Sequence, residues 1–507
     1  MTGDLQGLPI RRWGLHLLGL LALMWPPLVN GQPFFFSDTT AYVRAADLAV
    51  QIASRHHIRT AWSRPEAAPA PAGSAPAVGP IAAPQVHASD GQNGGSVMAG
   101  RSPYFGMLLY LGYVTSGFWL FVLGQAMTAW WLIGLAQRAM GSRSLAVRLG
   151  IAVILALLSP LAFYLGLLLA DALAGFGILA FLLIARPPPD LRRWERPALM
   201  LLLLVSAAAH LTHIVIIAGM TALLGLLALV RAVPWRTAKP AVLIGGAVTV
   251  LALLSVMVTN FAVKRALGKP PAAAPVLTAR FIVDGPGRAF IANGCGGDQQ
   301  FAACTRPTAV PDSDLWLWSP DPKIGGFLAA DADTRARLSA EDSRFARAVF
   351  TAYPLWQAGM MARNTLDQLT RFDLLILNEH CFADQGCSGV DFPDAGRATM
   401  RRTIAGRNLW PTRLLAALDA AATVAAIALL AISIRRLGRE RDEARKTLLL
   451  WVALTAAAFL INAFLGGAIS NPQTRYQERI VWIVPLLAMI AAIRAFRTSS
   501  EPARPRA

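Results

Sequence analysis

Residues 197–231 read PALMLLLLVSAAAHLTHIVIIAGMTALLGLLALVR, and this apolar run decides the fold. A helix needs about 20 residues to cross the roughly 30 Å hydrocarbon core of a bilayer, so the run is too long for a single crossing. Its middle is polar, because His210-Leu211-Thr212-His213 interrupts it. We therefore expect two membrane-spanning helices joined by a tight polar turn.

The same reasoning divides residues 149–185 in two and gives ten predicted spans. They are 13–30, 117–137, 149–165, 171–185, 197–210, 214–231, 240–261, 412–434, 447–466 and 479–496. The composition agrees, since 55% of the residues are hydrophobic, only 15% are charged, and the mean hydropathy is +0.48. About a quarter of the residues of a soluble protein are charged. The chain is therefore expected to be an all-α polytopic membrane protein, which excludes a soluble enzyme, a disordered tail protein and a fibrous repeat.

The basic residues predict the orientation of these spans. With the amino terminus inside, the cytoplasmic segments hold 22 basic and 7 acidic residues, whereas residues 262–411 hold 17 basic and 15 acidic ones. This bias follows the positive-inside rule and places both termini in the cytoplasm and the large loops outside. It also accounts for the net charge of +18 without nucleic acid as a partner. A signal peptide is the alternative for residues 11–30, but no good small-x-small cleavage site follows, so we expect a retained helix.

Three parts of the chain are expected. Residues 1–261 contain seven predicted spans and a first outer loop at 31–116, in which residues 63–100 are a low-complexity insert rich in Ala, Pro, Gly and Ser. Residues 262–411 are expected to form an extracytoplasmic loop domain. Residues 412–507 contain the last three predicted spans and a basic cytoplasmic tail.

All four cysteines lie in the predicted outer domain: Cys295, Cys304, Cys381 and Cys387. An even number of cysteines confined to a non-cytoplasmic segment indicates two disulfides. Pairing within Cys295–Cys304 and within Cys381–Cys387 is the simplest connectivity, and the other two connectivities stay open. A zinc site is the alternative, but the spacings match no common ligand pattern.

Ionisable residues recur at the predicted outer ends of helices: Asp38, Asp171, His210, His213, Arg475 and Arg479. Such groups are costly at membrane depth and mark functional sites. Each also has a structural explanation, because the acids can cap helices, the histidines can form a polar hairpin tip, and the arginines can reach lipid head groups. The arginines flank the last outer turn, against the charge bias, which favours anion binding. Asp419 is a lone acid that would pair with Arg413 or with a neighbouring helix.

Two carboxylates and two arginines at the outer surface suit chemistry on a lipid-linked phosphate. A guanidinium binds phosphate through two hydrogen bonds while the leaving group gathers charge. A carboxylate that loses hydration near the membrane boundary becomes a stronger general base toward a hydroxyl group. No glycine-rich phosphate loop for a soluble nucleotide sugar is visible in the sequence.

This layout resembles the GT-C superfamily of integral-membrane glycosyltransferases. The resemblance rests on Asp38 followed by Tyr42 after the first span, on Asp171 at a short outer turn, on the large late outer segment, and on Arg475-Tyr476 before the final helix. It implies a GT-C-like fold and transfer of a hexose or pentose from a polyprenyl-phosphate donor. The acceptor would be an envelope lipid, glycan or protein at the outer face of the bacterial cytoplasmic (inner) membrane.

The resemblance also implies roles for individual residues. Asp38 would be the catalytic base and Asp171 a second catalytic carboxylate. The substrate-binding residues would be Tyr42, His210, His213, Arg475, Tyr476 and Arg479. No cofactor is certain; Asp38 and Asp171 could share a divalent cation such as Mg or Mn, although Asp38-Thr39 lacks the second acid that metal-using members place nearby.

Three other functions are considered. An O-antigen-ligase-like or polymerase-like enzyme would use loop residues such as His380, Arg401, Arg402 and Arg407. A transporter or lipid-glycan flippase would have repeated halves with interrupted helices near the midplane, and no internal symmetry is visible. A structural membrane scaffold would tolerate Asp38→Asn without loss of function.

Overall fold

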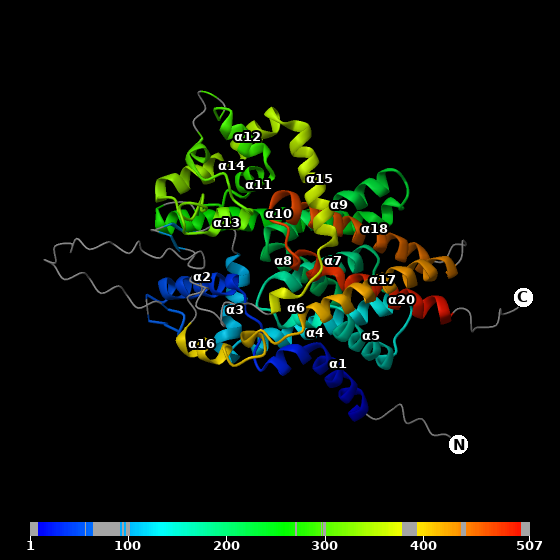
Figure 1. Ribbon diagram of the computed structural model, residues 1–507. Helices are drawn as coiled ribbons and strands as arrows, with labels where there is room; N and C mark the ends of the chain where they lie inside the picture. The colour runs from blue at the N-terminus through cyan, green and yellow to red at the C-terminus, as the bar shows by residue number, and fades with distance from the viewer. Residues whose placement is uncertain are drawn as a thin grey trace, which may run out of the picture.

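The computed structural model describes residues 9–55, 57–63, 92–93, 96–97, 102–268, 271–295, 297, 301–377, 393–437 and 443–497. Within these residues the chain is helical, apart from the two-residue antiparallel pair β1 (Gln92–Asn93) and β2 (Ser96–Val97) and one isolated bridge. The helices form a bundle with a second group of helices against one end of it (Figure 1).

Eleven described helices make up the bundle. They are α1 (Pro9–Asn30), α4 (Trp119–Ala139), α5 (Leu145–Leu158), α7 (Asp171–Ala185), α8 (Glu195–Ala209), α9 (Leu211–Leu229), α10 (Trp235–Leu267), α17 (Thr412–Arg436), α18 (Glu443–Ala463), α19 (Arg475–Val481) and α20 (Ile483–Arg497). Seven stretches are long and apolar enough to cross a membrane: Arg12–Asn30, Trp119–Ala139, Leu211–Leu229, Trp235–Arg265, Thr412–Arg436, Glu443–Ile469 and Arg475–Phe496. The multi-pass character expected from the composition is thereby supported.

Three of the ten predicted spans correspond to shorter helices. The helices α5, α7 and α8 have 14, 15 and 15 residues, so even the longer two rise only about 22 Å at 1.5 Å per residue. Helix α7 lies at the centre of the bundle, where all of its residues except Ile184 are buried. A helix surrounded by other helices does not need to match the thickness of the lipid.

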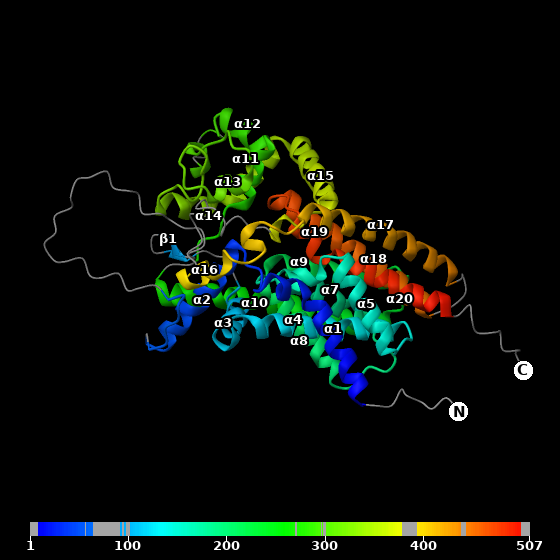
Figure 2. The same cartoon turned by 60° about the horizontal axis from the view of Figure 1, so that its bottom comes forward.

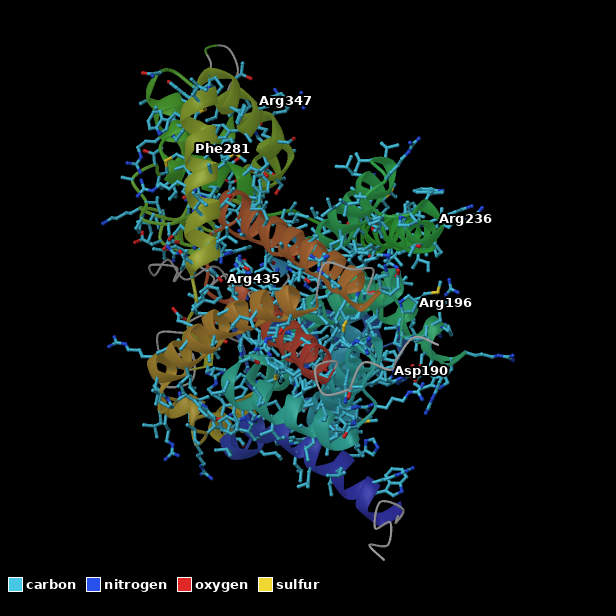
Figure 3. All side chains as sticks on the ribbon, turned by 90° about the vertical axis from the view of Figure 1, so that its right-hand side faces the viewer. Asp190, Arg196, Arg236, Phe281, Arg347 and Arg435 are labelled. Atoms are coloured by element: carbon cyan, nitrogen blue, oxygen red, sulfur yellow. A yellow bond between two sulfur atoms is a disulfide. The ribbon has the colours of Figure 1, made fainter. Side chains whose placement is uncertain are left out.

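The two ends of the bundle differ. Helix α1 begins and α20 ends on the side away from α11–α15, where the turns α4–α5, α7–α8 and α9–α10 also lie (Figure 2). Viewed from that side, Asp190, Arg196, Arg236 and Arg435 surround the bundle end, while Phe281 and Arg347 belong to the distant group of helices (Figure 3). We refer to the first side as the basic end and to the other as the outer end.

The group of helices at the outer end is the outer domain. It contains α11 (Val276–Asp284), α12 (Pro286–Ala292), η3 (Ala302–Thr305), α13 (Ser313–Trp318), α14 (Ala332–Ala352) and α15 (Pro354–Thr370). These helices have a hydrophobic core separate from that of the bundle, built around Phe281, Trp316, Phe327 and Phe345. The predicted disulfide Cys295–Cys304 is confirmed. Cys381 and Cys387 lie outside the described residues.

Tight packing joins the outer domain to the bundle. Helix α18 continues as a π-helical turn, η6 (Phe464–Ile469), that lies against α15. A β-carbon on Gly467 would lie 2.2 Å from the carbonyl oxygen of Asn364, so only glycine permits this approach. Such π-helical turns often occur at functional sites, and this one directly precedes the turn that leads to α19.

The remaining described elements cover the outer end of the bundle. They are α2 (Ser37–Ala53), α3 (Pro103–Ser116), α6 (Leu161–Gly166), η4 (Leu375–Leu377), α16 (Asp394–Met400) and η5 (Ala405–Arg407). Helix α3 begins at the cap Ser102, whose hydroxyl accepts a hydrogen bond from the Phe105 amide. It ends at Gly117, whose φ of 58° is the left-handed conformation that glycine adopts readily.

An extended segment after α1 crosses to the start of α7. The amide of Phe34 donates to the carbonyl of Gly166 at 2.9 Å, and the amide of Leu168 donates to the carbonyl of Phe34 at 2.9 Å. The Thr39 hydroxyl then donates to the carbonyl of Leu168. These bonds place the first turn of α2 beside the first turn of α7, which are the positions of Asp38 and Asp171.

Candidate functional site

Asp38 lies in the first turn of α2 and faces Arg475, the first residue of α19. A guanidinium nitrogen of Arg475 is 3.7 Å from a carboxylate oxygen of Asp38, and the two side chains are 16% and 18% exposed. The guanidinium also lies over the ring of Phe36 at 4.7 Å from its centroid, which is a cation–π contact. Both charged groups thus have partners in the protein but remain partly exposed.

Asp171 and Arg479 form a second ion pair, which is buried. Their closest nitrogen and oxygen atoms are 3.2 Å apart. The other terminal nitrogen of Arg479 donates to Asn462 Oδ1 at 2.6 Å and to Thr212 Oγ1 at 3.3 Å. Helices α7, α9 and α18 therefore all bind the same guanidinium, and its terminal donors are occupied.

Tyr476 lies between the two arginines. Its ring centroid is 5.2 Å from each guanidinium carbon. Arg475 and Arg479 do not flank an outer turn as predicted: residues 475–481 are helical, so the two arginines lie one turn apart on α19. Both side chains bind partners in the bundle from this helix.

The two predicted histidines occupy the junction of α8 and α9. His210 caps α9, since its Nδ1 accepts from the amide of Thr212 at 3.2 Å and lies 2.8 Å from the Thr212 hydroxyl. His213 is buried, with Nδ1 2.9 Å from the carbonyl oxygen of Ser206. Because Thr212 contacts both His210 and Arg479, the histidine turn adjoins the buried ion pair. The prediction that these histidines bind substrate stays a prediction.

Tyr42 lies one helical turn after Asp38 on α2 and packs against α3. Its ring is buried and meets the ring of Phe105 edge-on at 4.9 Å, and the backbone of Gly106 packs against its carbonyl oxygen. These contacts place it between α2 and α3. Substrate binding by Tyr42 likewise stays a prediction.

Asp419 of α17 and Glu478 of α19 form a further buried feature. Their carboxyl groups interact with each other, the two residues are 2% and 0% exposed, and none of the four carboxyl oxygens accepts a hydrogen bond from a donor among the described residues. Neither has an ion pair with a basic side chain among the described residues. Two carboxyl groups can form a hydrogen bond only if at least one carries a proton. Of the two partners considered for Asp419, the neighbouring helix is the one observed, and Arg413 is exposed.

The outer domain fixes the turn that precedes α19. The side-chain amide of Gln368 donates to the carbonyl of Gln473 at 2.8 Å, and its oxygen accepts from the Gln473 amide at 2.9 Å. Asp314 accepts hydrogen bonds from the side chains of Asn471, at 3.0 Å, and of Gln473. Burial raises the pKa of the Asp314 carboxyl, and the two amide donors offset part of this increase. The position of Arg475 thus depends on the outer domain.

A divalent cation does not fit this arrangement of residues. Asp38 and Asp171 each face a guanidinium, which already supplies the positive charge that a metal would add. Across the described part of the chain, His, Cys, Asp and Glu side chains nowhere gather in a group of three or more that could hold a metal ion. We assign no step to a metal.

The residues of the ligase-like alternative lie elsewhere. Arg401, Arg402 and Arg407 are exposed between α16 and α17, and His380 lies outside the described residues. Thr212 and Asn462 also hold Arg479; the sequence indicated Thr212 only as part of the polar interruption and did not indicate Asn462. A polar residue near the end of an apolar helix, as Asn462 is, was the available signal.

A comparison with models of protein families, with curated proteins and with solved structures finds no match for this chain. The resemblance to the GT-C superfamily therefore rests on the residues and spacings described above.

Proposed function

We propose that this chain is a multi-pass membrane glycosyltransferase that uses a polyprenyl-phosphate-linked sugar. The proposal includes all ten spans, with α5, α7 and α8 among them, a GT-C-like fold, and both termini in the cytoplasm of a bacterium. The outer end would then face away from the cytoplasm, in agreement with the disulfide Cys295–Cys304 of the outer domain.

The relation between Asp38 and Arg475 carries the proposal. Their 3.7 Å separation exceeds the 2.7–3.2 Å of a good N–H···O hydrogen bond, so the guanidinium keeps donor capacity for an incoming phosphate. The Nε of Arg475 has no hydrogen-bond partner among the described residues. A phosphate that binds Arg475 would take the place of the Asp38 carboxylate at this guanidinium, and the carboxylate would then accept a proton.

The reaction follows from this exchange of partners. The acceptor hydroxyl oxygen attacks the anomeric carbon of the sugar and transfers its proton to the carboxylate of Asp38. The bond between the anomeric carbon and the phosphate oxygen breaks, and its electron pair leaves with the polyprenyl phosphate. Arg475 binds this phosphate as it gains charge, which stabilises the transition state more than the ground state.

We assign Arg479 and Asp171 a positioning role. Arg479 is bonded to Asp171, Thr212 and Asn462 and is nearly inaccessible, so it has little capacity left for a substrate. Its fixed place in the bundle holds α19, and with it the backbone of Arg475. The hydroxyl of Tyr164 adds a hydrogen bond to the Arg475 carbonyl at 3.3 Å.

The test is transfer by the purified full-length protein in detergent, with a panel of short-chain polyprenyl-phosphate hexoses and pentoses. Asp38→Asn keeps the shape of the side chain and removes the base, so we expect transfer to fall about a hundredfold or more. Asp321→Asn, at an exposed position in the outer domain, is the matched control and should be fully active. Size-exclusion profiles and melting temperatures must agree among the three proteins. Equal transfer by Asp38→Asn and the parent would refute the assignment of the base.

A further inference from the structure

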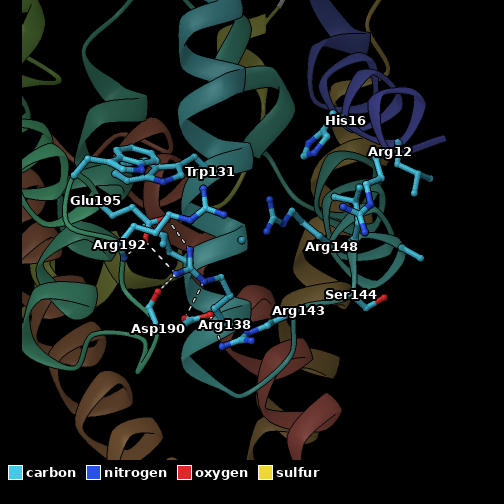
Figure 4. A pocket seen from close by; sticks show the side chains of 16 residues that line it. Arg12, His16, Trp131, Arg138, Arg143, Ser144, Arg148, Asp190, Arg192 and Glu195 are labelled. Atoms are coloured by element: carbon cyan, nitrogen blue, oxygen red, sulfur yellow. Dashed lines mark hydrogen bonds and ion pairs between the residues drawn. The ribbon is translucent and has the colours of Figure 1, made fainter. Parts of the chain in front are cut away.

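A cavity of about 990 Å³ lies at the basic end of the bundle (Figure 4). The start of α1, the end of α4, the start of α5 and the turn between α7 and α8 line it. Helix α7 begins at Asp171 and ends at Ala185, just before that turn, so the cavity and the Asp38–Arg475 pair lie at opposite ends of this helix. The cavity is therefore separate from the proposed catalytic site.

The lining of the cavity is strongly basic. Five arginines and two acids contribute to it, namely Arg12, Arg138, Arg143, Arg148, Arg192, Asp190 and Glu195, which leaves a net of three positive charges. The guanidinium of Arg138 forms ion pairs with both acids, at nitrogen-to-oxygen distances of 3.0 Å to the Asp190 carboxylate and 2.7 Å to the Glu195 carboxylate. Arg143 adds a second contact to Asp190 at 2.8 Å. The acids are thus already neutralised.

Arg148 and Arg192 are two of the three remaining positive charges, and the third belongs to Arg12. Within the described part of the chain, neither guanidinium has an ion pair with an acid, and Arg148 Nε is a buried nitrogen without a hydrogen-bond partner. The two side chains extend toward each other from opposite sides of the cavity (Figure 4), and their like charges repel. An anion between them would relieve the repulsion and accept hydrogen bonds from both.

Membrane topology alone does not explain this arrangement. The positive-inside rule requires arginines at this end of the bundle, but it is equally satisfied by side chains that extend into solvent. Arg196 and Arg236 are examples, since both are exposed and neither lines the cavity (Figure 3). Arginines from different helices that converge on one partly open cavity need a further reason.

The walls of the cavity indicate where the anion comes from. Helix α1 contributes His16, which accepts a hydrogen bond from Trp130 Nε1 at 2.9 Å, while neighbouring Trp13 and Leu17 are 75% and 58% exposed. This apolar flank of α1 would border lipid. On the other side, the rings of Trp131 and Trp194 stack at 5.8 Å, and tryptophan is enriched where membrane meets water.

We propose that this cavity binds the phosphate group of an anionic lipid from the leaflet at the basic end. Basic pockets between membrane helices on the cytoplasmic side are suited to such head groups. The guanidinium groups of Arg148 and Arg192 donate to the phosphate oxygens, and the acyl chains lie along the exposed flank of α1. A free phosphate or pyrophosphate offers the same chemistry, so the test separates the two sources.

The first measurement is native mass spectrometry and thermal unfolding of the full-length protein in mild detergent. Phosphatidylglycerol should remain bound and raise the melting temperature, and phosphatidylcholine should do neither. Inorganic phosphate and pyrophosphate form the second arm, at ionic strength matched with chloride. Stabilisation by these ions that depends on Arg148 and Arg192 would support the cavity as a phosphate site and assign it a soluble ligand.

Variants make the test specific. Arg148→Gln with Arg192→Gln should weaken phosphatidylglycerol binding about tenfold. Arg196→Gln with Arg236→Gln removes the same charge at the same end of the bundle and should leave binding unchanged. Arg192→Gln alone, at an exposed position, provides a variant whose folding is safe if the double change lowers expression.

Two results would overturn the proposal. Equal losses of binding in the two double variants would show that only the overall charge attracts the lipid. Equal retention of phosphatidylglycerol and phosphatidylcholine by the parent protein would show that the cavity does not recognise phosphate charge. Neither result bears on sugar transfer at the outer end.

Discussion

The guanidinium of Arg479 binds the carboxylate of Asp171 at 3.2 Å although 308 residues separate them in the chain. This contact ties α19 to α7, the most enclosed helix of the bundle. Since Asn462 and Thr212 bind the same guanidinium, four helices meet at one buried charge. The stability of the outer end should depend on that charge being balanced.

Removal of Asp171 should therefore destabilise the protein strongly. Asp171→Ala leaves the Arg479 charge buried without its counter-ion, which typically costs about 3–5 kcal/mol. Asp171→Leu combined with Arg479→Met removes both charges and should recover much of the melting temperature, but not the activity, because α19 loses its anchor. Thermal unfolding in one detergent measures both effects. A double variant that melts as low as Asp171→Ala would show that the charge balance is unimportant.

A change at Arg475 should act on the donor and leave the fold intact. The side chain is partly exposed and its closest carboxylate is 3.7 Å away, so Arg475→Ala is expected to cost little stability. We expect the KM for the polyprenyl-phosphate donor to rise at least about tenfold, and kcat to fall as well, because Arg475 also stabilises the charge that the leaving phosphate gains. Arg475→Lys keeps the charge and loses the paired hydrogen bonds, so its KM for the donor should lie between those of the parent and of Arg475→Ala. A change only in acceptor preference would contradict the assigned role.

The outer domain should control the site through Gln368. Its side chain satisfies the amide and the carbonyl of Gln473, and Gln368→Ala would leave both without these partners. Each lost hydrogen bond costs about 1 kcal/mol, and the freed turn would let Arg475 shift. We expect the KM for the donor to rise. The helical content measured by circular dichroism should stay nearly unchanged. As a control, Thr370→Ala removes only a local bond to the Asp367 carbonyl.

Apolar length and charge predicted much of the architecture. Each predicted span overlaps a helix, and seven helices are long and apolar enough to cross a membrane, because hydrophobic length is a property of the local sequence. The polar interruption at His210 likewise falls at the junction of α8 and α9, where its side chain caps α9. Local signals of this kind need no knowledge of the partner helices.

The partners of the polar side chains could not be predicted in the same way. Nothing near Asp419 in the sequence identifies Glu478, and nothing near Asp314 identifies Asn471. Residues 475–481 are helical and carry several of these distant contacts, whereas the polar residues there indicated a turn. The cavity at the basic end was not predicted, because the positive-inside rule already accounts for arginines there.

The buried acids Asp419 and Glu478 should tolerate conversion to amides. Two neighbouring buried carboxyl groups can share a hydrogen bond only if one of them carries a proton, whereas the amide of Asp419→Asn can donate such a bond to Glu478 without one. We expect melting temperatures within a few degrees of the parent for Asp419→Asn and for Glu478→Gln. Asp419→Lys would instead introduce a bulky cation beside Glu478 and is expected to lower the yield of folded protein. A strong loss of stability in both amide variants would show that the pair requires its negative charge.

Asp314 should make the outer domain more stable in mild acid than at neutral pH. Burial raises the pKa of this carboxyl above its unfolded value, so its contribution to stability is fully present below the unfolded pKa of about 3.9 and is lost as the pH rises through the folded pKa. Asp314→Asn keeps an acceptor oxygen for Asn471 and Gln473 and removes the titration.

The melting temperature of the Asp314→Asn variant should therefore fall less than that of the parent as the pH is raised from 4 to 8. Asp321→Asn, at an exposed position of the same domain, should follow the parent. Parallel curves for the parent and Asp314→Asn would mean that this carboxyl does not contribute to the pH dependence.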